Sequence, residues 1–291
     1  MDRLGTLLDR LVGNPTVGDH GGGYRPDPVH LLGLAVAIPV VLSALLRVAV
    51  NAPLALPQGI VGVESAAETA VMFLGGLAGL VAGFRSRSTV ERVALVAVGV
   101  FAGLAAVNHA AAVPAAGVLV VGAATLVGHR IHHLDGPDGR TVVAAGFALA
   151  LAAALGATTG LLTPGFRSVA TWLTLLSLAG LTTVVRPGWP GWLLGGLAIA
   201  GVLYAGIVSP FLTGAVVLIG AGVVGTPLLL VAAGFGGAVA AISDAALSGN
   251  AVIALGGLLL LAAGVPATVP AAVAVVVGLV LLLHRPTGVS A

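Results

Sequence analysis

The sequence predicts an all-α polytopic integral membrane protein. Hydrophobic residues make up 58% of the chain and charged residues only 8%, a composition that suits a hydrocarbon solvent better than a soluble core. From His30 to His284 the chain is divided into apolar stretches of roughly spanning length, and most of its charge falls in the breaks between them. The alternation of apolar and polar residues typical of barrel strands is absent. At about 20 residues per crossing, we expect about ten or eleven transmembrane helices in one bundle.

The chain is expected to have three parts. Residues 1–28 form a cytoplasmic arm, which begins with a short amphipathic interfacial helix and continues as a Gly/Pro linker. Residues 29–284 form the transmembrane bundle, and residues 285–291 form a short polar tail. The interfacial helix is inferred from leucines that share one helical face: Leu4, Leu7, Leu8 and Leu11.

The predicted spans follow one another with short connections. The first six are His30–Val50, Glu64–Phe84, Glu91–Val107, Ala115–Ile131, Thr141–Leu162 and Ser168–Val185. The last five are Gly191–Val208, Phe211–Val224, Leu228–Leu247, Ala251–Gly264 and Thr268–Leu283. Several of these are short, which is typical either of re-entrant or broken helices or of short spans beside a thinned bilayer.

The arginines predict the orientation. All 12 basic side chains are arginine, a bias that often accompanies prokaryotic sources, so we expect a prokaryotic plasma membrane. The positive-inside rule places most of them, and the N-terminus, in the cytoplasm. The side of the C-terminus depends on whether one segment is re-entrant. The arginines assigned to the cytoplasm are Arg3, Arg10, Arg25, Arg85, Arg87, Arg92, Arg130, Arg140 and Arg186, whereas Arg47 and Arg167 fall outside.

A weak internal repeat runs through the spans. Gly76–Arg85 resembles Ser177–Arg186, and VAAGF recurs at Val143 and Val231. The segment from Phe73 returns once more from Ala254. With four spans between equivalent positions, the copies would be parallel four-helix repeats. Chance similarity between helices rich in alanine, glycine and leucine is the alternative.

Ionisable residues within apolar spans are the main functional candidates, because a charge in hydrocarbon normally faces a partner or water. Six polar residues fall near the outer ends of the predicted spans, where they are expected to line one water-filled vestibule as a transport pathway. These candidates are Arg47, Glu64, Glu68, Asn108, His109 and Asp244.

Two carboxylates with a histidine suit a proton or cation site, and Arg47 is the alternative fixed counter-charge. Glu64 and Glu68 are spaced i, i+4 and therefore share a helix face. They could instead form only the exposed first turn of a helix, where negative charge complements the helix dipole. For Asn108 and His109 the alternative is a role in a loop.

Several functions are excluded by the motifs that the sequence lacks. The chain has no cysteine, and no phosphate-loop, HExxH or GxSxG motif occurs. His129, His132 and His133 are too few for the di-iron centre of a membrane desaturase. We therefore expect neither an enzyme nor a bound metal or cofactor, and a membrane-embedded metalloenzyme ranks third among the functional hypotheses. The scattered arginines at span ends give no reason to expect nucleic acid as a partner.

The leading functional hypothesis is a small-solute transporter or permease-type component. Lacking a phosphate loop, such a protein would be ion-coupled, a facilitator, or dependent on a separate ATPase. A noncatalytic scaffold or accessory subunit of a larger membrane complex is the alternative. The expected partners are the lipid bilayer, an unidentified small solute or ion, and either partner subunits or further copies of this chain.

Overall fold

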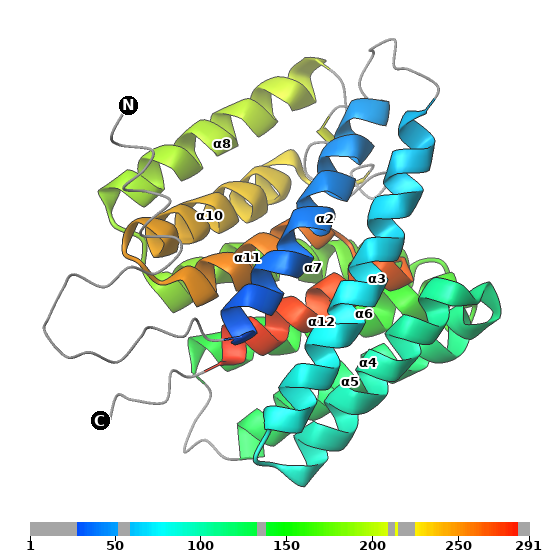
Figure 1. Cartoon of the computed structure of the whole chain (residues 1–291). Coiled ribbons are helices and arrows are strands. Elements are labelled where there is room, and N and C mark those ends of the chain that lie inside the picture. The colour runs from blue at the N-terminus through cyan, green and yellow to red at the C-terminus, as the bar shows by residue number, and fades with distance from the viewer. Residues whose placement is uncertain (1–27, 52–58, 133–137, 209–212, 215–224, 285–291) are drawn as a thin grey trace, which may run out of the picture.

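The structure is a computed structural model that describes residues 28–51, 59–132, 138–208, 213–214 and 225–284. Every regular element among these residues is a helix (Figure 1). Eight of the helices are long and apolar enough to cross a membrane. The predicted all-α membrane architecture is therefore confirmed.

The helices follow the predicted spans closely. The first group is α2 (Pro28–Asn51), α3 (Ile60–Arg85), α4 (Thr89–Val107), the short 3-10 helix η1 (His109–Ala111), α5 (Ala112–His132) and α6 (Gly139–Thr158). The second is α7 (Phe166–Val185), α8 (Trp189–Val208), α10 (Leu228–Leu247), α11 (Ala251–Ala263) and α12 (Val269–Leu283). The predicted span Phe211–Val224, the arm up to residue 27 and the tail 285–291 lie outside the described residues.

Side-chain caps explain where several helices begin. The Oδ1 atom of Asp138 accepts a hydrogen bond of 2.8 Å from the backbone N–H of Thr141 at the start of α6. Asn250 and Thr268 cap α11 and α12 in the same way. Each cap satisfies a backbone donor that the first helical turn leaves without an intrahelical partner.

The two shortest α-helices among the described residues, α11 and α12, occupy the interior of the bundle. They form an antiparallel hairpin, and none of their residues is exposed. Helix α12 contacts α2, α3, α4, α5 and α6, whereas α11 contacts α2, α7 and α10 (Figure 1). At about 20–22 Å, 13- and 15-residue helices are shorter than the hydrocarbon core. Their shortness is tolerated because protein rather than lipid surrounds them.

The contacts between α8 and α10 show that these two helices are antiparallel. Gly191 faces Ala240, and Gly195 faces Gly236. Near the other ends of these helices, Gly206 lies beside Leu228. The end of α8 and the start of α10 are therefore at the same side of the bundle, and the chain makes no net crossing between them.

This geometry contradicts the predicted parallel repeats for the VAAGF pair, whereas α3 and α7, which carry Gly76–Arg85 and Ser177–Arg186, do run in the same direction. Residues 139, 143 and 146 of α6 lie beside residues 183, 180 and 177 of α7, so these helices are antiparallel. Residues 234 and 237 of α10 lie beside residues 175 and 179 of α7, so those helices are parallel. Consequently α6 and α10, which carry the two VAAGF segments, run in opposite directions. The similarity reflects shared composition at those segments.

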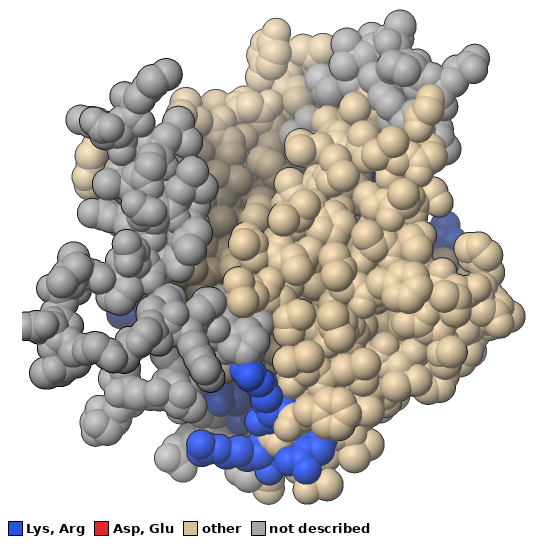
Figure 2. Space-filling model, viewed as in Figure 1, with Lys and Arg blue, Asp and Glu red and all other residues tan. Residues whose placement is uncertain are grey.

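Arginines gather at one end of the bundle, which we call the arginine-rich end. It holds Arg85, Arg87, Arg92, Arg130, Arg140 and Arg186, at the ends of α3, α5 and α7 and the starts of α4 and α6. In the view of Figure 2, most of the visible Lys/Arg atoms cluster at the lower end of the molecule. The opposite side, which we call the Arg47 end, carries Arg47 and Arg167. Pro28 and His284 both lie at the arginine-rich end, because the ten described α-helices from α2 to α12 alternate in direction.

Glycines allow the long helices to approach one another closely. A Cβ atom placed on Gly99 of α4 would lie 2.6 Å from the carbonyl oxygen of Gly76 and 2.9 Å from the backbone nitrogen of Leu80 in α3. Such spacing is tighter than van der Waals contact permits. Close approach of this kind stabilises helix pairs in lipid, where no hydrophobic force drives association.

Replacing Gly99 with alanine should therefore separate α3 from α4. We expect Gly99→Ala to lower stability by about 1–3 kcal/mol through overpacking. The measurement is thermal unfolding in detergent, followed by tryptophan fluorescence. Gly103→Ala on the same helix is the matched control, because its Cβ meets nothing within 4 Å, and it should be neutral or stabilising by up to about 1 kcal/mol. Equal losses in the two variants would contradict this account of α3–α4 packing.

The crossing count can be tested by labelling, because the natural chain has no cysteine. Arg87→Cys, between α3 and α4, and Ser248→Cys, after α10, should react with an impermeant maleimide from the same side of the membrane. Leu161→Cys, between α6 and α7, should react from the opposite side. Should Ser248→Cys behave like Leu161→Cys, the chain would make a net crossing between α8 and α10.

Candidate functional site

The structure brings together three of the six predicted residues, Arg47, Glu64 and Glu68. The Nη2 atom of Arg47, near the end of α2, lies 3.5 Å from Oε1 of Glu68 and donates a hydrogen bond to it. Its Nε atom lies 4.0 Å from Oε1 of Glu64. We call these residues the Arg47 cluster. Glu64 and Glu68 lie one turn apart on one face of α3, which places both carboxylates beside the same guanidinium.

The cluster is partly buried. It contains two carboxylates and one guanidinium, and therefore has one formal negative charge in excess. The three side chains are between 23% and 33% exposed. Because α3 begins at Ile60, Glu64 lies in its second turn rather than in the free first turn. The Arg47 cluster is therefore an ion-pair group between two helices, and the simple dipole explanation does not account for it.

Arg47 also reaches toward the central hairpin. It lines a small cavity with Ser43 of α2, Val71 of α3, Ala263 at the end of α11 and Pro270 at the start of α12. The Arg47 cluster thus lies at the entrance to the space around α12.

Asn108 and His109 are on the same side of the bundle but do not join the cluster. The Oδ1 atom of Asn108 accepts a hydrogen bond of 3.0 Å from the backbone N–H of Ala110, so this residue caps η1. Both side chains are exposed. Among the described residues, neither forms a hydrogen bond or ion pair with the Arg47 cluster. The structure therefore places them in the connection between α4 and α5.

The predicted position of Asp244 is wrong. It lies near the end of α10 at the arginine-rich end, where its Oδ1 atom accepts a hydrogen bond of 3.0 Å from the backbone N–H of Gly188. The sequence threading assumed a net crossing between α8 and α10, and without that crossing the direction of α10 is reversed. Asp244 therefore fixes the α7–α8 connection to α10 and is remote from the Arg47 cluster.

One face of α3 continues from the Arg47 cluster along the length of α12. Its members recur at helical spacing of three or four residues. They are Glu64, Glu68, Val71, Gly75, Ala78, Ala82 and Arg85. We call this face the α3 stripe.

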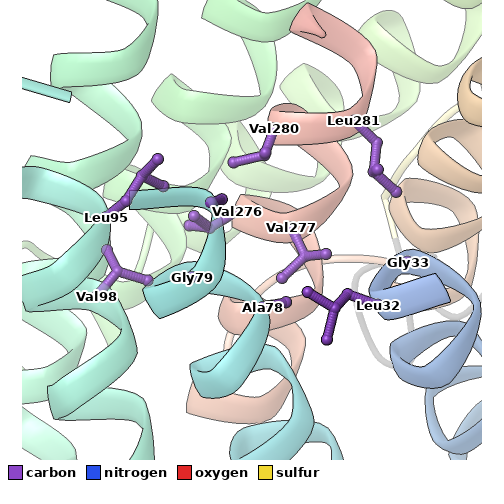
Figure 3. A pocket seen from close by; sticks show the side chains of 11 residues that line it. Leu32, Gly33, Ala78, Gly79, Leu95, Val98, Val276, Val277, Val280 and Leu281 are labelled. Carbon is purple, nitrogen blue, oxygen red and sulfur yellow. The ribbon is translucent and has the colours of Figure 1, made fainter. Parts of the chain in front are cut away.

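An apolar cavity lies in the middle of the α3 stripe. In Figure 3, Ala78 of α3 lies close to Val277 of α12, and Leu32 of α2 lies beside them. Leu95 of α4 and Val280 of α12 also line this cavity. The wall is almost entirely apolar, and with a volume of about 20 Å³ the cavity has room for little more than one water molecule in the described conformation.

A second cavity, of about 250 Å³, opens at the arginine-rich end. It shares Ala82, Leu95 and Val280 with the apolar cavity, so the two adjoin. Its polar lining residues are Arg85, Ser86, Glu91, Arg130 and His284. We call this the arginine cavity. Sequence reasoning missed it, although Arg85 and Arg130 both end spans predicted to finish on the same side.

A constriction separates the small cavity at Arg47 from the apolar cavity. A Cβ atom on Gly75 would lie 2.2 Å from Cγ1 of Val273 on α12. Helices α3 and α12 therefore touch here through a glycine. The space along the α3 stripe is closed at this level in the described conformation.

The residues present offer no cluster with metal-ligand character. Within the described ranges, no group of three or more His, Cys, Asp or Glu residues is close enough to hold a metal ion. His129 and Glu91 form a pair of such residues, with Nε2 of His129 3.7 Å from Oε1 of Glu91. What the arrangement offers chemically is charge at both ends of an apolar interior.

Comparison with known proteins identifies one match. A family described as an integral membrane family of unknown function, DUF8068, matches residues 29–283. These bounds coincide with the bundle from α2 to α12. No curated protein and no solved structure matches the chain.

The ion pairs of Arg47 should have unequal strengths. Double-mutant cycles with Arg47→Gln, measured by thermal unfolding in detergent, should give Arg47 and Glu68 a coupling of about 0.5–1 kcal/mol. The coupling with Glu64 should be smaller because its distance is longer. Arg167→Gln combined with Glu68→Gln is the control pair and should be additive. A larger coupling for Glu64 than for Glu68 would contradict the described geometry.

Proposed function

Because this chain belongs to the integral membrane family DUF8068, we propose that it is a multi-pass membrane transporter or permease-type component for small solutes. The proposed path follows the α3 stripe between α3 and α12, from the Arg47 cluster to the arginine cavity. One observation carries the proposal: two cavities of about 20 Å³ and one of about 250 Å³ succeed one another along the buried helix α12, with charged groups at both ends and an apolar interior between them.

The Arg47 cluster supplies the proposed entrance. Its excess negative charge attracts a cation or a proton, while Arg47 stabilises the remaining carboxylate. A solute or coupling ion that binds Glu68 would compete with Arg47 for this carboxylate. Such competition would weaken the link between α2 and α3 at the level of the α11–α12 connection.

The constriction at Gly75 and Val273 serves as the proposed gate. It is a contact between a glycine and one valine methyl group, so a small displacement of α12 relative to α3 would open it. The α11–α12 connection contains Gly264 with φ +62°, a conformation that glycine adopts at little cost. This connection is a suitable place for the hairpin to change its angle.

The arginine distribution supports a location in the cell membrane with the arginine-rich end in the cytoplasm. In this orientation the Arg47 cluster faces outward, whereas Pro28 and His284, the first and last described residues, lie on the cytoplasmic side. The proposed path then connects an outer acidic site with an inner basic one.

A second candidate function is a noncatalytic scaffold or accessory subunit, and α8 favours it. This helix contacts chiefly α10, and only 22% of its spanning window is buried within the bundle. Its exposed apolar side chains include Trp192, Leu197 and Ile207. A partner subunit or another copy of this chain could bind this face within the membrane.

Transport by the purified protein in liposomes tests the proposal. The assay uses labelled amino acids, organic acids, sugars and inorganic ions, with and without a proton or sodium gradient. For any solute that the wild type moves, Ala78→Leu should lower flux about tenfold or more, because it fills the apolar cavity. Glu68→Gln should cause a comparable loss because it removes a charge that the entrance requires.

Two variants control for general damage. Ala97→Leu makes the same side-chain change in the outward-facing groove between α4 and α5, and Asp244→Asn alters a carboxylate outside the path. Both should transport normally. Absence of flux for the whole panel would favour the scaffold function, and flux that survives both Ala78→Leu and Glu68→Gln would rule out the α3 stripe as the path.

A further inference from the structure

A groove of about 550 Å³ lies between α4 and α5, on the outside of the bundle. These two helices are at the edge of the bundle (Figure 1), and only 28% of the spanning window of α4 is buried. By helical spacing, the groove faces away from Leu95, the α4 residue that lines the apolar cavity. It therefore faces the hydrocarbon of the bilayer and is separate from the proposed path. We call it the α4–α5 groove, and its apolar lining includes Val90, Val93, Ala94, Gly117, Val118 and Val121.

Small residues create this groove. Ala94 contributes a single methyl group, and a Cβ atom placed on Gly117 would meet nothing within 4 Å. At the floor, a Cβ atom on Gly122 would lie 2.5 Å from Cγ2 of Val98, so the two helices touch there. A space of this size is not left empty in hydrocarbon, because a void forfeits dispersion contacts on every side. Either lipid or another protein segment must fill it.

The α4–α5 groove begins at the membrane surface and ends within the hydrocarbon. Thr89, at the start of α4, lines it at the arginine-rich end. The contact of Gly122 with Val98 sets the register of the two helices, so Gly117 lies about five residues beyond the level of Val98. At about 1.5 Å per residue the groove is roughly 20 Å long, whereas the hydrocarbon core is about 30 Å thick. A transmembrane helix would need contact across the whole core. An acyl chain, which starts at a headgroup and ends inside the bilayer, matches this shape.

Arg87 and Arg92 provide positive charge at the surface end of the groove. Both residues are exposed, and Nη2 of Arg92 donates a hydrogen bond of 2.9 Å to the backbone carbonyl of Ser86. The nearby carboxylate of Glu91 accepts a hydrogen bond of 2.8 Å from the Ser86 hydroxyl and lies 3.7 Å from Nε2 of His129. The α3–α4 connection therefore places two exposed guanidiniums at the level where lipid phosphates lie.

We propose that the α4–α5 groove holds one acyl chain of a phospholipid from the leaflet at the arginine-rich end, with the lipid phosphate bound by Arg87. A methylene group is similar in size to a water molecule, which takes up about 30 Å³, so the groove has room for roughly eighteen such groups. The planar fork of arginine forms paired hydrogen bonds with phosphate oxygens. This site is independent of the proposed transport, because it lies on the other face of α4 and requires only binding.

The first experiment maps the acyl chain with a photoactivatable phospholipid that carries a diazirine near the end of one chain. The full-length protein is placed in phosphatidylcholine nanodiscs containing this lipid and irradiated, and its labelled peptides are quantified by mass spectrometry. Labelling should concentrate in residues 117–125. Gly117→Leu should lower it at least about fivefold, because the new side chain fills the groove and the acyl chain loses many small contacts. Gly201→Leu on α8 is the matched control, since it makes the same change at another exposed glycine with open surroundings, and it should leave labelling unchanged.

The second experiment tests the headgroup contact in the same nanodiscs. Arg87→Gln should lower the labelling of residues 117–125 by about two- to fivefold, the range expected for an exposed ion pair. Arg186→Gln is the matched control, because it removes an exposed arginine from the same end of the bundle without changing the groove lining. An equal loss in the two variants, or no loss in Arg87→Gln, would overturn the assigned phosphate contact.

Two further results would overturn the proposed lipid site. One is labelling of residues 117–125 that is no stronger than that of α8, or that persists in Gly117→Leu, because ordinary contact with bulk lipid would then explain it. The other is occupation of the groove by a second copy of this chain, in which case Val121→Cys would form disulfide-linked dimers in native membranes. If Gly117→Leu fails to fold, Val121→Phe decides the question. Val121 is 64% exposed, so a larger side chain there narrows the groove without creating a buried defect.

Discussion

The enclosure of α12 by other helices is the constraint on which the rest of this structure depends. Helices α11 and α12 are among the most apolar helices of the chain, yet none of their residues is exposed. A helix of this length facing lipid would force the bilayer to thin or the helix ends to enter hydrocarbon. Surrounding the short hairpin with long helices removes that problem. The long helices meet the membrane, and the hairpin meets only protein.

This arrangement also explains how the two charged groups come to lie at opposite ends of one interior. The start of α12 lies beside Arg47, and its end lies beside Arg85 and Arg130. Because α3 runs parallel to α12, a single stripe of α3 connects both groups. The small residues of this stripe, Gly75, Ala78 and Ala82, leave space against α12 that larger side chains would fill. The same residues that permit close helix contact therefore determine where the cavities lie.

Much of the fold followed from composition and span length. Most helix bounds agree with the predicted spans within a few residues, because apolar length and flanking polar residues decide them locally. The exception is informative. Composition alone does not show whether an apolar segment such as Phe211–Val224 crosses the membrane. The direction of α10 is established by the contacts of Gly195 with Gly236 and of Gly206 with Leu228.

The site was predicted only in part for the same reason. Glu64 and Glu68 share a helix face by spacing, and Arg47 ends the preceding span, so their proximity could be foreseen. Asp244 could not be placed, since one extra crossing moves it to the other side of the membrane. Asn108 looks identical in sequence whether it lines a cavity or caps a helix. His284 was not predicted to line a cavity, because the sequence does not decide on which side of the membrane the C-terminus lies.

The buried position of the α11–α12 hairpin has a consequence for biosynthesis. The ribosome makes the chain from its N-terminus, so the helices that enclose α12 are synthesised before it. During that interval no protein fills the space between the enclosing helices. The nascent bundle must either hold lipid there or remain loosely assembled. The final thirty or so residues of the bundle then complete its core, so truncated chains lacking them would be substrates for membrane quality control.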